Sequence, residues 1–385
     1  MPEPILSLVP EPGGPVDWPM ILQSALGEPL TRLSSIPQNP VWHGEGDVLS
    51  HTKMVCEALV SGGEWRALPD RERQILFLAA LLHDVGKAVC TRFEYGAWSS
   101  PHHSLTGASM ARTLLWLDFG LCGTPEKQSL RESVCQLIRA HMAPIHVQDL
   151  PMPERKVIQL SADGAQANGF SNRLLAILAR ADTLGRVSTD TNELLDAIEF
   201  FEELAKEQCC LDAPYPFAST FERYLYLSGD SRWPVPRYDA TWGQILMLSG
   251  LPGVGKDTYL HQALPGLPVV SLDDIREELG VSPQKPQAPV IAAAKQRAME
   301  LLRSRQPFVW NATDLTAMIR KKQISLFSAY GAATRILYLE TGWEEQLRRN
   351  ESRSRAVPQA AIQHMLGRLV PPLPSEAQDI EWRCV

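Results

Sequence analysis

Residues 244–258 read Gln-Ile-Leu-Met-Leu-Ser-Gly-Leu-Pro-Gly-Val-Gly-Lys-Asp-Thr, and this stretch decides the fold of the second half of the chain. An apolar run comes first, a glycine-rich turn follows, and a helical pattern begins at the lysine. In this context the glycines let backbone N–H groups surround phosphate oxygens, and the helix N-terminus adds a favourable dipole. An incidental glycine-rich turn is the alternative. The stretch predicts a nucleotide-binding loop made of Gly250, Gly253, Gly255 and Lys256, with the lysine on the β- and γ-phosphates.

The residue after the lysine departs from the usual pattern of such loops. That position normally holds Ser or Thr, whose hydroxyl binds Mg²⁺, whereas this chain has Asp257 followed by Thr258. Either Asp257 binds the metal, directly or through water, or Thr258 takes over the role. The sequence leaves both possibilities open.

Beyond the proline-rich stretch that ends near residue 240, short apolar runs alternate with helical segments, which is typical of a parallel sheet in an α/β domain. We therefore predict a P-loop domain over residues 241–385, with a parallel sheet and a helical lid. The predicted strands are Ile245–Leu248, Val269–Ser271, Phe308–Trp310 and Ile336–Leu339.

Two further segments of this domain carry charges suited to phosphate chemistry. Asp273 and Arg276 follow the second strand, at the edge of the sheet where ligands bind. A carboxylate there can accept a proton from an attacking hydroxyl, although an acidic helix cap would look the same. Residues 348–355 hold four arginines, whose planar groups suit polyphosphates.

In this order, the three segments resemble the P-loop polynucleotide kinase family. Its members follow the loop lysine with Asp-x-x-Arg and with a lid of the form Arg-Asn-x-x-Arg before Val-Pro. The resemblance implies that Asp273 is the general base on a 5′-hydroxyl and that Arg276 contacts the acceptor phosphate. It also implies ATP or another NTP with Mg²⁺ as cofactors. The lid residues that would grip the ATP phosphates are Arg349 and Arg353, before Val357-Pro358.

The first half of the chain has helical rather than strand periodicity. We predict an all-α domain over residues 1–211 and a proline-rich linker over 212–240, because helices seldom tolerate so many prolines. The predicted helices are Arg71–Leu82, Ala108–Trp116, Glu132–Arg139, Arg173–Ala181 and Thr191–Lys206.

Histidines and carboxylates are concentrated in a few short segments of this helical half. His83 and Asp84 end the apolar run Ile75–Leu82, where a carboxylate without a partner would be costly. Six of the nine histidines lie in such segments. Imidazole and carboxylate ligands suit Zn, Fe, Ni, Co or Mn and leave positions open for water and phosphate. The six are His43, His51, His83, His102, His103 and His141.

The ordered His…His-Asp…Asp pattern resembles the HD phosphohydrolase superfamily, which has an all-α fold. The resemblance implies one or two divalent metal ions and a metal-bound water whose pKa is lowered for attack on phosphorus. His103 is preferred over His102 by its spacing to Gly107, and His43 is equally a ligand, a substrate contact or a helix-start residue. The ligands that the resemblance implies for the first metal are His51, His83, Asp84 and Asp182. His103 and His141 would bind a second metal. Lys87 and Arg186 would hold the substrate phosphate.

The whole layout resembles the bacterial HD-Pnk end-healing enzymes. That resemblance implies RNA or DNA ends as substrates: removal of 2′,3′-cyclic or 2′-phosphates, phosphorylation of 5′-hydroxyls, and sealing by a separate ligase. Three alternatives remain. The chain could be an HD nucleotidase fused to a nucleotide or other small-molecule kinase, or a non-catalytic nucleotide sensor. It could also act in tRNA processing or signalling, because residues 43–47 are similar to HD domains attached to tRNA nucleotidyltransferases.

Composition and charge agree with a cytoplasmic enzyme. The net charge is −7, yet residues 241–385 hold 17 Lys and Arg against 14 Asp and Glu, so the acidic excess lies in the first half. The seven cysteines show no disulfide spacing. The N-terminus lacks a basic signal region, and the longest apolar run is far shorter than the roughly 20 residues that span a bilayer. We expect no association with a membrane.

Overall fold

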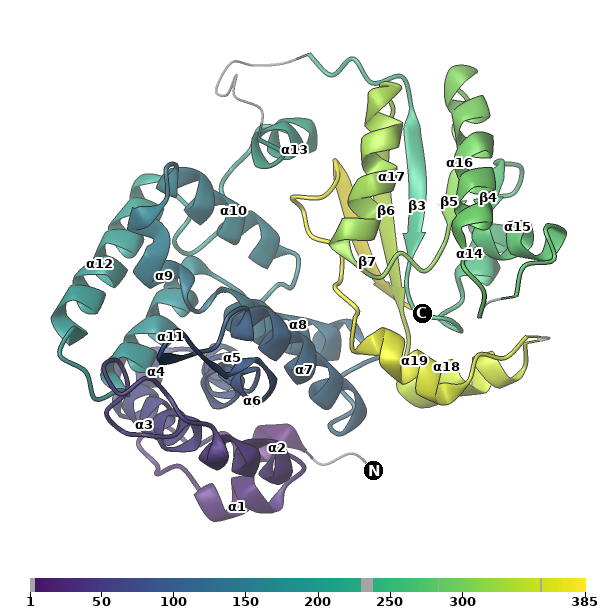
Figure 1. The fold of residues 1–385 in the computed structure, drawn as a ribbon. Coiled ribbons are helices and arrows are strands. Elements are labelled where there is room, and N and C mark those ends of the chain that lie inside the picture. Colours follow the sequence, from purple (N-terminus) through teal and green to yellow (C-terminus); the bar gives the residue numbers. More distant parts are fainter. Residues whose placement is uncertain (1–3, 230–237, 283, 354) are drawn as a thin grey trace. The chain divides into compact units, whose positions relative to one another are not determined.

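The computed structural model describes residues 4–229, 238–282, 284–353 and 355–385, which fall into two compact units (Figure 1). One unit comprises Met1–Cys122 and Glu126–Pro216, and the other comprises Gly123–Pro125 and Phe217–Val385. Within the described ranges, no helix is both long enough and apolar enough to cross a membrane.

The first unit is helical, as predicted. All five helices expected from apolar periodicity are confirmed, within α5, α7, α8, α11 and α12. Its α-helices are α1 (Trp18–Gln23), α2 (Gly27–Arg32), α3 (Val48–Ser61), α4 (Gly63–Ala67), α5 (Asp70–Leu82), α6 (Lys87–Cys90), α7 (His103–Leu117), α8 (Pro125–Ala140), α9 (Ala143–His146), α10 (Pro153–Ala165), α11 (Asn172–Leu184) and α12 (Thr191–Glu207). Short 3-10 helices cover Ile5–Leu8, Leu33–Ser35 and Val147–Asp149.

Helix α5 is the centre of this unit. Every side chain from Ile75 to Leu82 is buried, so this part of the helix is apolar all round, as an enclosed helix must be. It packs against α3 and α11, and those two helices also pack against each other. Three helices that carry predicted metal ligands therefore form one rigid support.

A β-hairpin interrupts the helices of this unit, and sequence periodicity did not predict it. Its strands are β1 (Arg92–Glu94) and β2 (Ala97–Ser99), which pair antiparallel. Tyr95 and Gly96 form the two-residue turn with φ of 54° and 80°. Positive φ at both turn residues gives the turn type whose twist matches a hairpin.

The second unit is an α/β domain whose five-stranded sheet is parallel throughout, in the order β4-β5-β3-β6-β7. The four predicted strands are confirmed, and the C-terminal strand β7 was not predicted. The strands are β3 (Gln244–Ser249), β4 (Val269–Ser271), β5 (Val309–Asn311), β6 (Ala333–Glu340) and β7 (Asp379–Cys384). The helices are α13 (Thr220–Leu227), α14 (Lys256–Ala263), α15 (Leu272–Glu278), α16 (Ala288–Arg303), α17 (Ala317–Ala329), α18 (Trp343–Glu351) and α19 (Gln359–Leu366).

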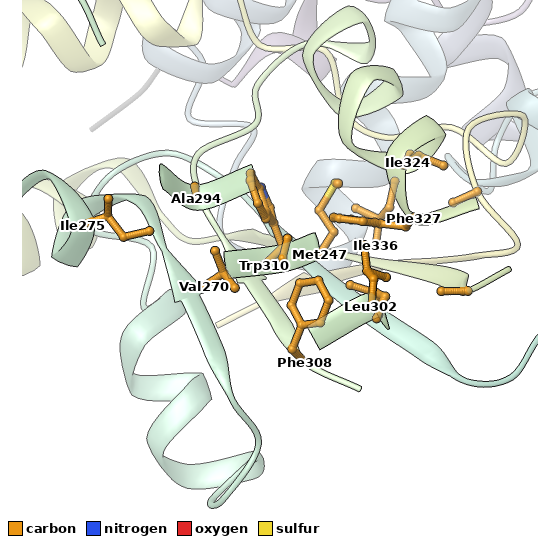
Figure 2. Packing of buried hydrophobic residues seen from close by; sticks show 14 of the residues in the cluster. Met247, Val270, Ile275, Ala294, Leu302, Phe308, Trp310, Ile324, Phe327 and Ile336 are labelled. Atoms are coloured by element: carbon orange, nitrogen blue, oxygen red, sulfur yellow. The ribbon is translucent and has the colours of Figure 1, made fainter. Parts of the chain in front are cut away.

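An apolar core joins the sheet to α16 and α17 (Figure 2). Trp310 of β5 and Phe327 of α17 lie edge to face, with ring centroids 5.9 Å apart. Met247 of β3 and Leu302 of α16 belong to the same buried cluster. This packing holds the strands whose carboxyl ends carry the nucleotide-binding loop.

The proline-rich segment predicted as a linker, residues 212–240, contains structure of its own. Helix α13 lies within it, begins at the Ser219 cap and buries Tyr226. Arg223 donates a 2.8 Å hydrogen bond to the carbonyl oxygen of Gln378 in the same unit. Residues 230–237 of the predicted linker lie outside the described residues. The domain boundaries therefore remain a prediction.

Candidate active sites

All six residues predicted to bind metal come together in the helical unit. Five of them are buried, and His103 is partly exposed. They are His51 on α3, His83 and Asp84 at the end of α5, His103 at the start of α7, His141 just after α8, and Asp182 on α11.

The six residues form two groups that meet at Asp84. The groups are His51, His83 and Asp182, and Asp84, His103 and His141, and each has its ligand atoms within 4.8 Å of one another. Asp84 Oδ2 lies 3.3 Å from His83 Nε2, and Asp84 Oδ1 lies 3.4 Å from His103 Nε2. One carboxylate thus faces both groups, which suits either a single metal ion or two ions that share Asp84.

In these histidines, the hydrogen-bond partner of Nδ1 determines whether Nε2 carries a lone pair. The rings of His83, His103 and His141 each have Nδ1 within 2.8 Å of a backbone carbonyl oxygen, to which only an N–H can donate. The Nε2 atoms then face inward unprotonated. Those of His51 and His83 are 3.4 Å apart, and those of His103 and His141 are 3.3 Å apart. Facing lone pairs repel each other unless a cation lies between them, so this geometry fits a metal centre.

Protonation at this centre also favours metal binding. Burial and the neighbouring His83 lower the pKa of His141 to about 3, so that ring is neutral. Burial alone would raise the pKa of Asp84, but Lys87 and His83 hold it well below its usual value. Oδ1 of Asp84 is buried and accepts no hydrogen bond. Burial alone would lower the pKa of His51, but Asp182 and Glu45 raise it. Imidazole and carboxylate ligands without a thiolate suit the transition metals predicted above.

The two predicted phosphate contacts lie against the carboxylates. Lys87 Nζ is 2.7 Å from Asp84 Oδ2 and donates to Gln38 at 2.8 Å. Arg186 donates to Asp182 Oδ1 at 2.8 Å. Both cations are therefore at the centre, and their contact with substrate phosphate remains a prediction.

Glu45 is a residue of this centre that the sequence did not identify. Its Oε1 lies 2.8 Å from Nδ1 of His43 and 3.0 Å from Nδ1 of His51, and its Oε2 accepts from the backbone N–H of Val187 at 2.9 Å. A carboxylate on the outer nitrogen of a ligand histidine orients the ring and fixes its tautomer. His43, whose role the sequence left open, thus lies beside His51 as a second partner of Glu45. The segment Trp42–His51, which contains both histidines and Glu45, is the sequence feature from which Glu45 could have been identified.

A close approach of two glycines places His103 rather than His102 at the centre. A Cβ on Gly86 would lie 2.1 Å from the carbonyl oxygen of His103 and 2.6 Å from the nitrogen of Gly107. Only glycine therefore lets the start of α7 pack on the loop after Asp84. His102 is exposed.

The nucleotide-binding loop of the second unit has the backbone that its glycines predict. Gly250, Gly253 and Gly255 have φ of 146°, 83° and 92°, and a Cβ on Gly250 would lie 2.5 Å from the carbonyl oxygen of Leu339. Lys256 begins α14 and donates to the carbonyl oxygens of Gly250 and Leu251 at 2.9 and 3.1 Å. The ammonium group of Lys256 thus contacts carbonyl oxygens of the loop itself, and it would exchange these contacts for phosphate oxygens.

Strand β5 adds a polar residue to this site that the sequence did not identify. Asn311 lies in register between Leu248 of β3 and Ser271 of β4. It donates to Asp257 Oδ1 at 2.9 Å, and its own Oδ1 is buried without a hydrogen-bond partner. Because Asn311 follows the predicted strand Phe308–Trp310, the rule that ligands lie at the carboxyl ends of strands would have found it. Two side-chain oxygens are thus available to Mg²⁺, which prefers such ligands.

We predict that Asp257, not Thr258, supports Mg²⁺ binding. Asp257→Asn is expected to weaken metal binding about tenfold to a hundredfold, as the loss of a charged or orienting group does at other metal sites. Mn²⁺ titration followed by electron paramagnetic resonance, with a non-hydrolysable NTP present, measures this directly. Thr258→Val is the matched control. A larger effect of Thr258→Val would assign the metal to the hydroxyl.

Asp273 and Arg276 lie together at the start of α15. Ser271, not Asp273, accepts the capping hydrogen bond of this helix, so the helix-cap alternative does not account for Asp273. The Asp273 side chain is 70% exposed and pairs with Arg276, which also donates to Gln287 at 2.8 Å. Burial lowers the pKa of Lys256, and the Asp273 carboxylate is close enough to oppose part of that shift.

The predicted lid arginines reach the loop from α18 and the segment after it. Arg353 lies 3.8 Å from Asp257 Oδ2, and a Cβ on Gly255 would be 3.3 Å from Arg349 NH1. Gln346 donates to the carbonyl oxygen of Pro252 at 2.9 Å, which joins α18 to the loop. Both arginines therefore lie at the loop, and their contact with NTP phosphates remains a prediction.

The protonation of Lys256 predicts how NTP affinity varies with pH. Burial lowers its pKa to about 8, although Asp257 and Asp273 act in the opposite direction. Bound phosphates favour the charged lysine, so binding above pH 8 takes up a proton. Affinity is therefore expected to fall as pH rises beyond about 8, approaching tenfold per pH unit. Calorimetric titration from pH 7 to 10 measures it. Lys256→Arg, which keeps its charge, should remove the dependence.

Two family models match the chain over these two sites. Residues 48–184 match the HD domain, and this range holds all six clustered metal-ligand candidates. Residues 245–372 match an AAA domain and include the loop and the lid arginines. The chain joins an HD domain to a P-loop kinase-like domain. Glu45 lies just before the range matched to the HD domain, and Arg186 lies just after it. No curated protein matches the chain closely enough to be called a relative.

Proposed function

We propose that this protein heals nucleic-acid ends. Its HD domain hydrolyses 2′,3′-cyclic or 2′-phosphate ends, and its kinase-like domain phosphorylates 5′-hydroxyl ends with ATP or another NTP. The observation that carries the hydrolase assignment is the convergence of imidazole lone pairs and carboxylates around Asp84. The end so healed would be a substrate for a separate ligase.

The HD domain has groups for each part of phosphoester hydrolysis. A divalent metal held by the clustered residues would lower the pKa of its bound water. Lys87 and Arg186 would neutralise the phosphate when it displaces their carboxylate contacts. Glu45 would keep the His51 ring in its ligand orientation.

The kinase-like domain has the corresponding groups for phosphoryl transfer. Lys256 and the lid arginines would bind the NTP phosphates, and Asp273 would accept the proton of the attacking hydroxyl. Asp273 is largely exposed, so an acceptor far larger than a mononucleotide can reach it. This exposure favours a polynucleotide over a small-molecule acceptor.

Transfer of label from γ-labelled ATP to a 5′-hydroxyl oligonucleotide tests the kinase assignment. We expect transfer by the full chain and none by Lys256→Ala. A mononucleoside that outcompetes the oligonucleotide would contradict the proposal and favour a small-molecule kinase. Hydrolysis of a 2′,3′-cyclic phosphate end on a separate oligonucleotide tests the HD domain. A chain with neither activity would be a nucleotide sensor.

A further inference from the structure

The β1–β2 hairpin carries three aromatic side chains, of which Phe93 and Tyr95 are exposed and Trp98 is partly buried. Phe93 and Trp98 are cross-strand partners on one face, with ring centroids 5.1 Å apart. Phe93 is 58% exposed, and Tyr95 at the tip is fully exposed. Single exposed apolar residues are common on proteins, but three aromatic residues within six positions form a patch that calls for a partner.

The tip of the hairpin is strained in a way that presents Tyr95. The first turn residue has φ of 54°, a conformation that suits Asn, Asp or Gly and is unusual for a bulky side chain. Backbone strain of this kind concentrates at binding and catalytic sites, where the surroundings maintain it. Glycine, asparagine or aspartate would suit this conformation better, so the turn itself does not require the Tyr95 ring.

The base of the hairpin is joined to the metal centre. The hydroxyls of Thr91 and Ser100 lie 2.8 Å apart and close the base. The carbonyl oxygen of Ser100 lies 2.8 Å from Nδ1 of His103, whose Nε2 faces Asp84. Trp98 is two residues from Ser100, so their Cα atoms are at most about 7 Å apart. The hairpin that carries the aromatic face is thus connected through Ser100 to His103, a ligand candidate of the metal centre.

We propose that this hairpin is a stacking platform for the bases of a single-stranded nucleic acid whose end enters the HD site. The inference rests on the proposed hydrolase function and adds how that site selects a polynucleotide. Stacking on aromatic rings tolerates any sequence, because every base has a π face. The opposite face of the hairpin carries the ion pair Arg92–Glu94, so only one face is aromatic.

Binding of two hexanucleotides to the full-length protein tests the platform. Both probes carry a 5′-phosphate and a 3′-hydroxyl, so neither site can modify them, and one lacks the bases of its last three nucleotides. By fluorescence anisotropy, Phe93→Ala, Tyr95→Ala and Trp98→Ala should each raise the Kd of the base-bearing probe about fivefold to a hundredfold. The Kd of the abasic probe should not change.

Matched variants separate stacking from other effects. Phe200→Ala removes a partly exposed aromatic ring from α12 and should leave both Kd values unchanged. Trp98→Phe should restore most of the binding. Unchanged Kd in all three alanine variants would overturn the platform. Equal losses for both probes, together with less bound metal, would overturn it in favour of a role in positioning His103.

Two further outcomes identify which idea has failed. If the alanine variants instead lose binding to phosphatidylserine vesicles and keep oligonucleotide binding, the aromatic face serves a membrane surface and the proposal is wrong. If base-dependent binding behaves as expected but the wild-type protein hydrolyses no 2′,3′-cyclic phosphate end, the platform stands and the proposed hydrolase function fails.

Discussion

Replacing His83 and Asp84 together by Ala is expected to abolish hydrolysis of a 2′,3′-cyclic phosphate and to strip transition metal from the purified protein. His83 belongs to one of the two groups of predicted ligands and Asp84 faces both, so the double change disrupts both groups. Metal content by mass spectrometry and hydrolysis rates measure the two effects. Kinase activity should survive, because Lys256 and Asp273, the residues predicted to serve the NTP and its acceptor, belong to the other unit.

Controls keep this prediction interpretable. Loss of Asp84 leaves the buried Lys87 without its carboxylate, which can destabilise the domain. A companion variant that also carries Lys87→Met removes the unpaired charge, and circular dichroism reports the folding of both. His146→Ala changes an exposed histidine and should have no effect. Loss of kinase activity in a folded His83→Ala, Asp84→Ala protein would contradict the modular interpretation.

Replacing Asp273 by Asn should reduce phosphorylation of a 5′-hydroxyl by about 10²–10⁴, the usual contribution of a general base. The amide keeps the shape of the side chain but cannot take the proton. ATP affinity should change little, because Asp273 is not among the residues predicted to hold the NTP phosphates. Single-turnover phosphorylation and calorimetric ATP binding measure the two quantities separately.

The neighbouring Asp274 is the matched control for Asp273. Both carboxylates lie in the first turn of α15, so either substitution removes one favourable charge from the helix start. Asp274→Asn should therefore reproduce any general helix effect without the catalytic one. Equal rates for the two variants would show that Asp273 contributes to the helix rather than to proton transfer.

Local pattern was sufficient to predict most of the fold. The apolar run Ile75–Leu82 predicted a buried helix, and residues 244–258 predicted the strand, the loop and the helix of the second unit. The hairpin at Arg92–Ser99 was not predicted, because its strands have three residues each and are too short for an alternating apolar pattern to be recognised. Strand β7 has alternating positions but follows a long irregular stretch.

The candidate sites were predictable where a residue belongs to a compact motif. His83-Asp84 and the glycines of the loop are of that kind. Glu45 was not recognised, because its role at the metal centre depends on contacts with His51 and with Val187, which is 142 residues away. Asn311 could have been found by its place at the end of a predicted strand, but its contact with Asp257 joins residues 54 positions apart. Contacts between distant segments are what periodicity and spacing cannot supply.

The strand order of the kinase-like domain has a consequence for how this enzyme is assembled. Strands β3 and β4 follow each other in the chain but do not pair, because β5 lies between them. The loop and Asp273 therefore have no common framework until a segment beginning at Val309 is inserted. Closing such non-local pairs is slow compared with local helix formation. Nucleotide binding should thus be among the last properties that a newly made or refolding chain acquires.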